Sequence, residues 1–190
     1  MDDAAPDLAL LAAWRAGDLR AGDALVSRHW AAVARFFRSK VGDDGADLIS
    51  QTFLACVEAR DRITGDNVKA YLFAVARKRL AEHFRRRARV VDLAVNSLVD
   101  LATGPVTQLG RRERGELVRA ALTRIPLDDQ IALELAYFEG LATRELAAVL
   151  EIPENTVRSR LSRARAKLRE VLGPDLADEA DAALGISDST

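Results

Sequence analysis

Residues 151–169 read EIPENTVRSRLSRARAKLR, a stretch that predicts a strongly basic amphipathic helix. At about 100° per residue, one face collects small and aliphatic side chains: Val157, Leu161, Ala164 and Leu168. The flanks hold the basic residues, with Arg158, Arg165 and Arg169 on one side and Arg160, Arg163 and Lys167 on the other. Within the helix no acidic residue stands between Glu154 and Glu170, so we expect these charges to lack partners. Such a helix packs on one side and presents the other to a negatively charged partner.

The residues before this helix predict a helix-turn-helix. A helix over residues 143–150, capped by Thr143, is followed by a short turn, and the basic helix begins near Asn155 or Thr156. We expect a small core made of Leu146, Ala147, Leu150, Ile152, Val157 and Leu161. The basic helix then enters the major groove of DNA. There Ser159, Ser162 and Arg163 reach base edges, with Arg158 nearby, while more peripheral arginines hold phosphates.

Composition predicts an all-α protein and argues against several function classes. The chain has 190 residues, of which 49% are hydrophobic, 30% are charged and only 5% are aromatic, and the abundance of Ala, Leu, Arg and Glu favours helix. The single cysteine, Cys56, excludes an internal disulfide and is expected in the core. With two histidines, His29 and His83, which we expect on helix surfaces, no structural metal site is predicted.

No catalytic or cofactor-binding pattern is present in the sequence. We find no nucleophile–base pair and no phosphate-binding loop, so we expect neither enzymatic activity nor a cofactor. The first residues do not show a basic region followed by an apolar stretch, and no run of 18 apolar residues occurs, so we expect a cytoplasmic chain without membrane insertion.

Charge is unevenly distributed along the chain. The net charge is only −1, but a second basic block lies between Arg77 and Arg89, opposed there by Glu82 alone. Acidic residues gather near both ends of the chain. Two separate basic patches on a nearly neutral chain indicate a polyanion that is contacted at two places.

Periodicity predicts two helical units joined by a linker. The first unit, residues 7–89, has a short helix and then three longer ones, whose expected inward residues are Val26, Trp30, Val33, Phe37, Ile49, Phe53, Cys56, Leu72, Val75, Ala76 and Leu80. GDDG at 42–45 and the polar loop DRITGDN at 61–67 separate these helices. Residues 90–112 lack a period and are predicted to be the linker. The second unit covers residues 113–172, with a helix capped by Asp128 and ended by Gly140, and residues 173–190 form an acidic tail.

These motifs resemble a known family. Residues 122–169, LTRIPLDDQIALELAYFEGLATRELAAVLEIPENTVRSRLSRARAKLR, are similar to region 4 of bacterial RNA polymerase sigma factors of the extracytoplasmic-function (ECF) type. Residues 47–89 resemble their region 2, although DLISQTF replaces the usual DLVQETF and ARK replaces ARN. Departures therefore fall at Ser50, Gln51 and Lys78, and Tyr71 stands where the family commonly has Trp. The resemblance covers roughly residues 7–172.

The resemblance implies a sigma factor that binds core RNA polymerase, directs it to promoters and assists promoter melting. Its implied partners are the clamp of the largest subunit, the flap of the second-largest subunit, promoter DNA and an anti-sigma factor. Implied polymerase contacts are Asp47, Gln51 and Glu58. Implied contacts to the −10 element are Asn67, Lys69, Tyr71, Arg77, Lys78 and Arg79. Implied contacts to the −35 element are Arg158, Ser159, Ser162, Arg163 and Arg165.

Two other interpretations stay open at this point. One is a helix-turn-helix regulator that is not a polymerase subunit, and the other is a helical adaptor that binds acidic protein or RNA. A dedicated regulator normally pairs its DNA-binding module with a ligand or receiver domain, whereas the first unit here has a polar loop and a basic helix. Tyr71 is likewise either a core aromatic or a base contact. Promoter-specific transcription with purified core polymerase separates the three functions.

Overall fold

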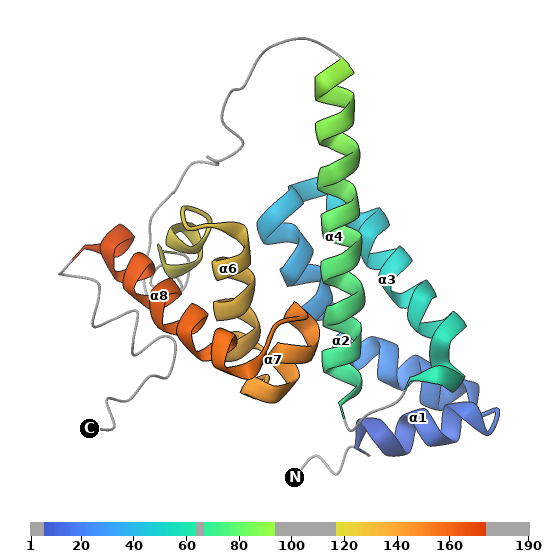
Figure 1. The fold of residues 1–190 in the computed structure, drawn as a ribbon. Helices are drawn as coiled ribbons and strands as arrows, with labels where there is room; N and C mark the ends of the chain where they lie inside the picture. The colour runs from blue at the N-terminus through green and yellow to red at the C-terminus, as the bar shows by residue number, and fades with distance from the viewer. Residues whose placement is uncertain (1–5, 64–66, 94–116, 174–190) are drawn as a thin grey trace, which may run out of the picture. The chain divides into compact units, whose positions relative to one another are not determined.

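A computed structural model of the chain describes residues 6–63, 67–93 and 117–173, and every element in these ranges is helical (Figure 1). The predicted all-α class is therefore confirmed. The chain divides into two compact units, residues 1–96 and 97–190. Most of the predicted linker (90–112) and of the predicted tail (173–190) lies outside the described residues, so those boundaries stay a prediction.

The described part of the first unit contains four α-helices: α1 (Asp7–Arg15), α2 (Leu19–Val41), α3 (Gly45–Ala59) and α4 (Val68–Leu93). Asp18 caps α2 by accepting hydrogen bonds from the backbone N–H groups of Arg20 (2.9 Å) and Ala21 (3.3 Å). Gly42 ends the same helix with a positive φ of 57°, which explains the predicted break at GDDG. The core between α2, α3 and α4 contains the side chains of Val33, Phe37, Leu48, Phe53, Leu72, Phe73, Ala76 and Leu80.

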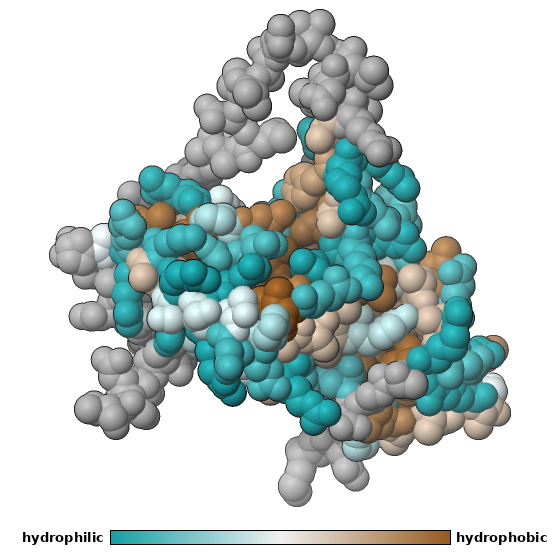
Figure 2. Space-filling model, viewed as in Figure 1, coloured by the Kyte–Doolittle hydropathy of each residue, from teal (hydrophilic) through white to brown (hydrophobic). Residues whose placement is uncertain are grey.

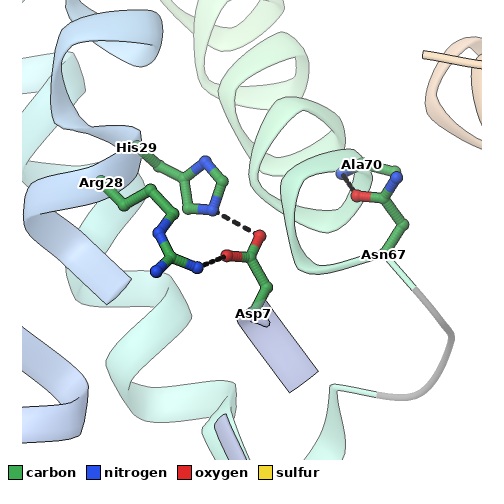
Figure 3. Close-up of polar contacts among 5 residues, drawn as sticks. All are labelled: Asp7, Arg28, His29, Asn67 and Ala70. Carbon is green, nitrogen blue, oxygen red and sulfur yellow. Dashed lines mark hydrogen bonds and ion pairs between the residues drawn. The ribbon is translucent and has the colours of Figure 1, made fainter. Parts of the chain in front are cut away.

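Helix α1 lies across the end of the unit at which α4 begins (Figure 1). Arg15 joins it to the segment before α4, since its guanidinium donates to the carbonyl oxygens of Arg60 (2.8 Å) and Ile63 (2.5 Å). At the other end of α1, the carboxylate of Asp7 contacts two residues of α2 (Figure 3). Its Oδ1 lies 2.7 Å from Nη1 of Arg28, and its Oδ2 lies 2.7 Å from Nε2 of His29. His29 is only 6% exposed, so its predicted place on a helix surface was wrong.

Trp30 is the clearest departure from the predicted core. Its position in the apolar period of α2 predicts burial, yet the residue is 47% exposed. The ring stacks on Phe53 of α3 at a centroid distance of 5.3 Å with an interplanar angle of 14°. The face of the indole that stacks on Phe53 is thus covered, and about half of the residue remains exposed to solvent.

Cys56 is buried in this core, with 3% exposure, as its neighbours Phe53 and Val57 predict. Burial raises the pKa of the thiol to about 11 from an ordinary value of 9.0. At pH 8 the thiolate fraction is then about 100-fold smaller than for an unperturbed thiol. We expect the folded protein to react with a thiol reagent such as dithionitrobenzoate at least about 100-fold more slowly than the protein in 6 M guanidinium. Equal rates in the two states would contradict the burial of Cys56.

The second unit contains the predicted helix-turn-helix. A helical segment over residues 117–122 is followed by α6 (Leu127–Leu133), a π-helical turn (Glu134–Phe138), α7 (Thr143–Leu150) and α8 (Glu154–Leu172). Leu146, Leu150 and Val157 are buried as predicted. Ala147, Ile152 and Leu161 are half-buried, and Val149 is a buried residue that the expected core omits.

The turn between α7 and α8 has a left-handed residue that is not glycine. Glu151 adopts φ 57° and ψ 41°, and the next N–H, that of Ile152, donates to the Ala147 carbonyl at 3.1 Å. This closes α7 in a single residue and lets α8 begin at Glu154, slightly earlier than predicted.

Two predicted helix caps were wrong by one or two residues. Asp128 lies in the first turn of α6, whose N-cap position is Pro126. Thr143 is the first residue of α7, and the backbone N–H of Ala142, at the N-cap position, donates to Oε2 of Glu145 at 2.7 Å. At α7 the capping side chain is therefore Glu145 inside the first turn, whereas at α6 no side chain caps the start and the carboxylates of Asp128 and Asp129 lie in its first turn.

Candidate nucleic-acid interface

Helix α8 carries the candidate DNA-reading face of the second unit. Val157, Ala164 and Leu168 are fully buried, and the last two belong to a core that includes Val118, Leu122 and Leu133. The opposite side of the helix therefore faces solvent, and Ser159, Ser162 and Arg163 are all exposed there. In Figure 2 the surface over α8 is mostly hydrophilic. The three residues predicted to reach base edges are thus brought together on one exposed face.

The other predicted −35 residues lie at the edge of this face. Arg158 is exposed and interacts with the preceding turn of α8. Its guanidinium donates a hydrogen bond to Oδ1 of Asn155 at 2.8 Å and forms an ion pair with Oε2 of Glu154 at 3.5 Å. Arg165 is half-buried on the same flank. Arg163 is exposed and makes no ion pair with any residue in the described ranges. Its charge is therefore available to a partner without the loss of an existing contact.

The expectation that the basic residues of α8 have no acidic partners was wrong. Asp128 and Asp129, in the first turn of α6, supply such partners from another helix. Arg160 lies 3.3 Å from Oδ2 of Asp128, and Nζ of Lys167 lies 2.5 Å from Oδ2 of Asp129. The local sequence of α8 does not contain these carboxylates, and only the packing of α6 on α8 brings them close.

In the first unit, Asn67 has a structural role that the family pattern does not indicate. Its Oδ1 accepts a hydrogen bond from the N–H of Ala70 at 2.9 Å, so the side chain caps the start of α4 (Figure 3). The predicted polar loop at 61–67 is described only at 61–63 and 67, and residues 60–62 form a 3₁₀ turn. The amide group of Asn67 thus stands at the junction of this loop and α4.

Tyr71 is half-buried near the start of α4. Burial raises the pKa of its phenol, with a further contribution from Cys56, while Arg62 and Lys78 act in the opposite direction. The phenol therefore stays protonated at neutral pH and can donate a hydrogen bond. Tyr71 and Lys78 are seven residues apart and share a face of α4, so an aromatic ring and a cation lie on one side of the helix.

The remaining −10 candidates do not share that face. Arg77 projects about 100° away from Lys78, and Lys69 lies one residue from the capped end of the helix. The guanidinium of Arg79 pairs with Glu82 of the same helix at 3.1 Å. Arg79 also lines a recess of about 250 Å³ together with Asp47 and Gln51 of α3. The structure therefore places Arg79 beside two of the candidate polymerase contacts.

The candidate polymerase-binding residues form a stripe on α3. Asp47, Gln51 and Glu58 are all exposed and repeat with helical spacing. Leu54 falls at the centre of the same stripe and is 56% exposed, a residue that the family pattern did not single out. Val57, three residues further along α3, and Trp30, which stacks on Phe53 of α3, add exposed apolar surface to this unit. The sequence could have identified Leu54, because positions 47, 51, 54 and 58 lie on one face of a helix.

Two negative findings concern the described residues. None of their helices combines the length and the apolar character needed to cross a membrane. Among the same residues, no three His, Cys, Asp or Glu side chains are grouped so that they could hold a metal ion.

The chain matches two family descriptions, "Sigma-70 region 2" over residues 25–90 and "Sigma-70, region 4" over residues 115–168. It is 32% identical over 138 residues to "ECF RNA polymerase sigma factor EcfG" of Rhodopseudomonas palustris, an alignment that covers 72% of this chain and 76% of the relative. It is 30% identical over 182 residues to "RNA polymerase sigma factor CnrH" of Cupriavidus metallidurans, covering 89% and 95% of the two chains.

Two solved structures are similar in fold. The sigma factor RpoE of Bartonella quintana, in complex with the anti-sigma factor NepR, has a TM-score of 0.63 and 26% identity and covers 79% of this chain and 95% of its own. CnrH in complex with the cytosolic domain of CnrY has a TM-score of 0.64 and 29% identity, and the match covers 87% of this chain and 96% of CnrH. Both likenesses span the two helical units.

Proposed function

The chain belongs to the ECF-type RNA polymerase sigma factors, and we propose that the exposed faces of α3, α4 and α8 divide the functions of that family among them. As such a factor, the chain binds core RNA polymerase, directs it to specific promoters and assists promoter melting. Its partners are core polymerase, promoter DNA and an anti-sigma factor. We place it in the cytoplasm and assign it no catalytic step of its own.

The stripe on α3 is the proposed contact to the polymerase clamp. Asp47, Gln51 and Glu58 supply polar groups at its edges, and Leu54 supplies the apolar centre. Protein interfaces commonly have this arrangement, in which a buried apolar centre is surrounded by a polar rim. Arg79 lines a recess together with Asp47 and Gln51 of this stripe. We therefore propose that Arg79 contacts the polymerase at the edge of the interface rather than the −10 element.

The start of α4 is the proposed contact to the opened −10 element. Strand separation leaves bases unstacked, and an aromatic ring beside cations can hold such bases and their phosphates. Tyr71 and Lys78 supply this combination on one helix face, and Asn67 supplies an amide at the end of the adjoining loop. Lys69 and Arg77, on other sides of α4, are proposed to contact the backbone only.

Helix α8 is the proposed reader of the −35 element, and the exposed face of Ser159, Ser162 and Arg163 is the observation that carries this function. An arginine can bind the O6 and N7 atoms of guanine in the major groove, and serine can serve several bases. Arg158 and Arg165, at the edge of the face, are proposed to hold phosphates.

Replacement of Arg163 tests the reading function. Arg163→Ala is expected to weaken promoter binding by the holoenzyme by about 1–3 kcal/mol, because one base-edge contact is lost. Affinity for core polymerase should stay at the wild-type value, since α3 is unchanged. The measurement is holoenzyme binding to a promoter selected with the wild-type protein, together with a separate titration of core polymerase.

Arg119→Ala is the matched control, because Arg119 is an exposed arginine of the same unit outside α8. It should leave promoter binding unchanged. Loss of both polymerase and promoter binding in Arg163→Ala would indicate misfolding. Wild-type promoter binding by that variant would exclude Arg163 from the readout.

A further inference from the structure

The basic residues on one flank of α8 differ in how their charges are compensated. Arg160 and Lys167 are seven residues apart and face α6, where each meets a carboxylate. In the Lys167–Asp129 pair the carboxylate is 12% exposed and the ammonium 45%, whereas in the Arg160–Asp128 pair the guanidinium is 22% exposed and the carboxylate 56%. Each pair therefore has one side chain largely covered at the α6–α8 junction and one that reaches solvent. Arg163, on the same side of the helix but nearer its outer face, has no such partner within the described ranges.

This arrangement matters because of where the flanks of a recognition helix lie. When a helix enters the major groove, its outer face meets base edges and its flanks approach the phosphates at the edges of the groove. A cation that neutralises a phosphate releases a counterion and adds affinity that is independent of sequence. A cation that already pairs with a carboxylate of the protein contributes less to this sequence-independent affinity, and least where the carboxylate is shielded from solvent, as Asp129 is.

Resting on the proposed −35 function of α8, we propose that Asp128 and Asp129 are specificity-determining positioning residues. They hold Arg160 and Lys167 against α6 and away from the DNA backbone. The pairs fix the direction in which α8 presents Ser159, Ser162 and Arg163. They also limit sequence-independent binding, so that a larger share of the affinity depends on base contacts.

Asp129→Asn tests the proposal because it keeps the size of the side chain and removes its charge. We expect Lys167 to be released toward phosphate. For holoenzyme on a 40-base-pair duplex of random sequence, the plot of log K against log [NaCl] should steepen by about 0.9. The pair of changes Asp128→Asn and Asp129→Asn should steepen it by about 1.8. The preference for a promoter selected with the wild-type protein over the random duplex should fall several-fold.

Two controls separate this effect from a general change in charge. In a Lys167→Met background, Asp129→Asn should no longer alter the salt slope, because the released cation is absent. Glu170→Gln removes one negative charge from an exposed position of α8 and should leave the slope unchanged. A slope that steepens equally in the Lys167→Met background, or in Glu170→Gln, would overturn the proposal.

Lys167→Met alone keeps the proposal testable if Asp129→Asn lowers the melting temperature too far for binding measurements. Because Asp129 holds Lys167 away from phosphate, Lys167→Met should have the same slope of log K against log [NaCl] as the wild-type protein. A slope shallower by about 0.9 would show that Lys167 already contacts phosphate, and the proposal would be wrong. If the wild-type holoenzyme did not distinguish the selected promoter from random duplex, and Arg163→Ala changed nothing, the −35 function itself would fail instead.

Discussion

Leu54→Asp is expected to weaken the binding of this sigma factor to core polymerase by about 100-fold or more. Burying a leucine side chain in an interface contributes about 1.5–3 kcal/mol, and a carboxylate at the same buried position adds a desolvation cost. Leu54 is 56% exposed in the free chain and lies among Asp47, Gln51 and Glu58 on α3, so a partner on this stripe would cover it. The measurement is a titration of labelled protein with purified core polymerase without DNA.

Leu19→Asp is the control for this change. Leu19 is an exposed leucine of the same unit, at the first position of α2, where an acidic residue suits the helix. This variant should bind core polymerase like wild type, and both variants should keep the wild-type melting temperature. If Leu54→Asp assembled normally, or if Leu19→Asp lost affinity equally, the stripe on α3 would not be the polymerase contact.

The combined replacement of Asn67 and Tyr71 is expected to reduce promoter opening by about tenfold or more. Base–aromatic stacking contributes about 1–3 kcal/mol per base, and Tyr71→Ala removes the only aromatic ring proposed to contribute it. Asn67 should be changed to Ser rather than Ala, because Ser retains an acceptor for the N–H of Ala70 and so keeps the cap of α4. Open complexes are followed by the permanganate reactivity of unpaired thymines.

The same variant should assemble with core polymerase and reach the closed promoter almost normally, since α3 and α8 are unchanged. A template mispaired in advance across the −10 element should restore part of the lost opening, because strand separation is then already supplied. Tyr71→Phe, which keeps the ring, should retain most of the activity. Normal opening of linear promoter DNA by the double variant would remove the start of α4 from the melting function.

The local features of this fold were predictable from the sequence because they depend on neighbouring residues. Helical periodicity placed Phe37, Leu72 and Leu80 in the core, and the break at GDDG follows from Gly42. The helix-turn-helix was predictable for the same reason, since two short helices and a tight turn lie within about thirty residues. The errors at Asp128 and Thr143 concern single positions at helix starts, where several acidic and hydroxyl residues compete for the role of cap.

The exposure of individual side chains was less predictable. Trp30 fits the apolar period of α2 but about half of the residue is exposed to solvent, and His29, in the neighbouring position, is buried against α1 by Asp7. A period identifies which residues share a face. It does not state how far a neighbouring helix covers that face, because this depends on helix spacing and on side-chain size.

The sequence by itself therefore determined the all-α class, the basic character of α8 and the side of α8 that faces outward. Only the tertiary structure decided which charges on α8 remain available. Lys167 and Asp129 are 38 residues apart in the chain, and they meet because α6 packs against α8. The place of Arg79 in a recess with Asp47 and Gln51 of α3 was decided in the same way. Contacts between helices depend on packing angles and distances, which a pattern read along one helix does not contain.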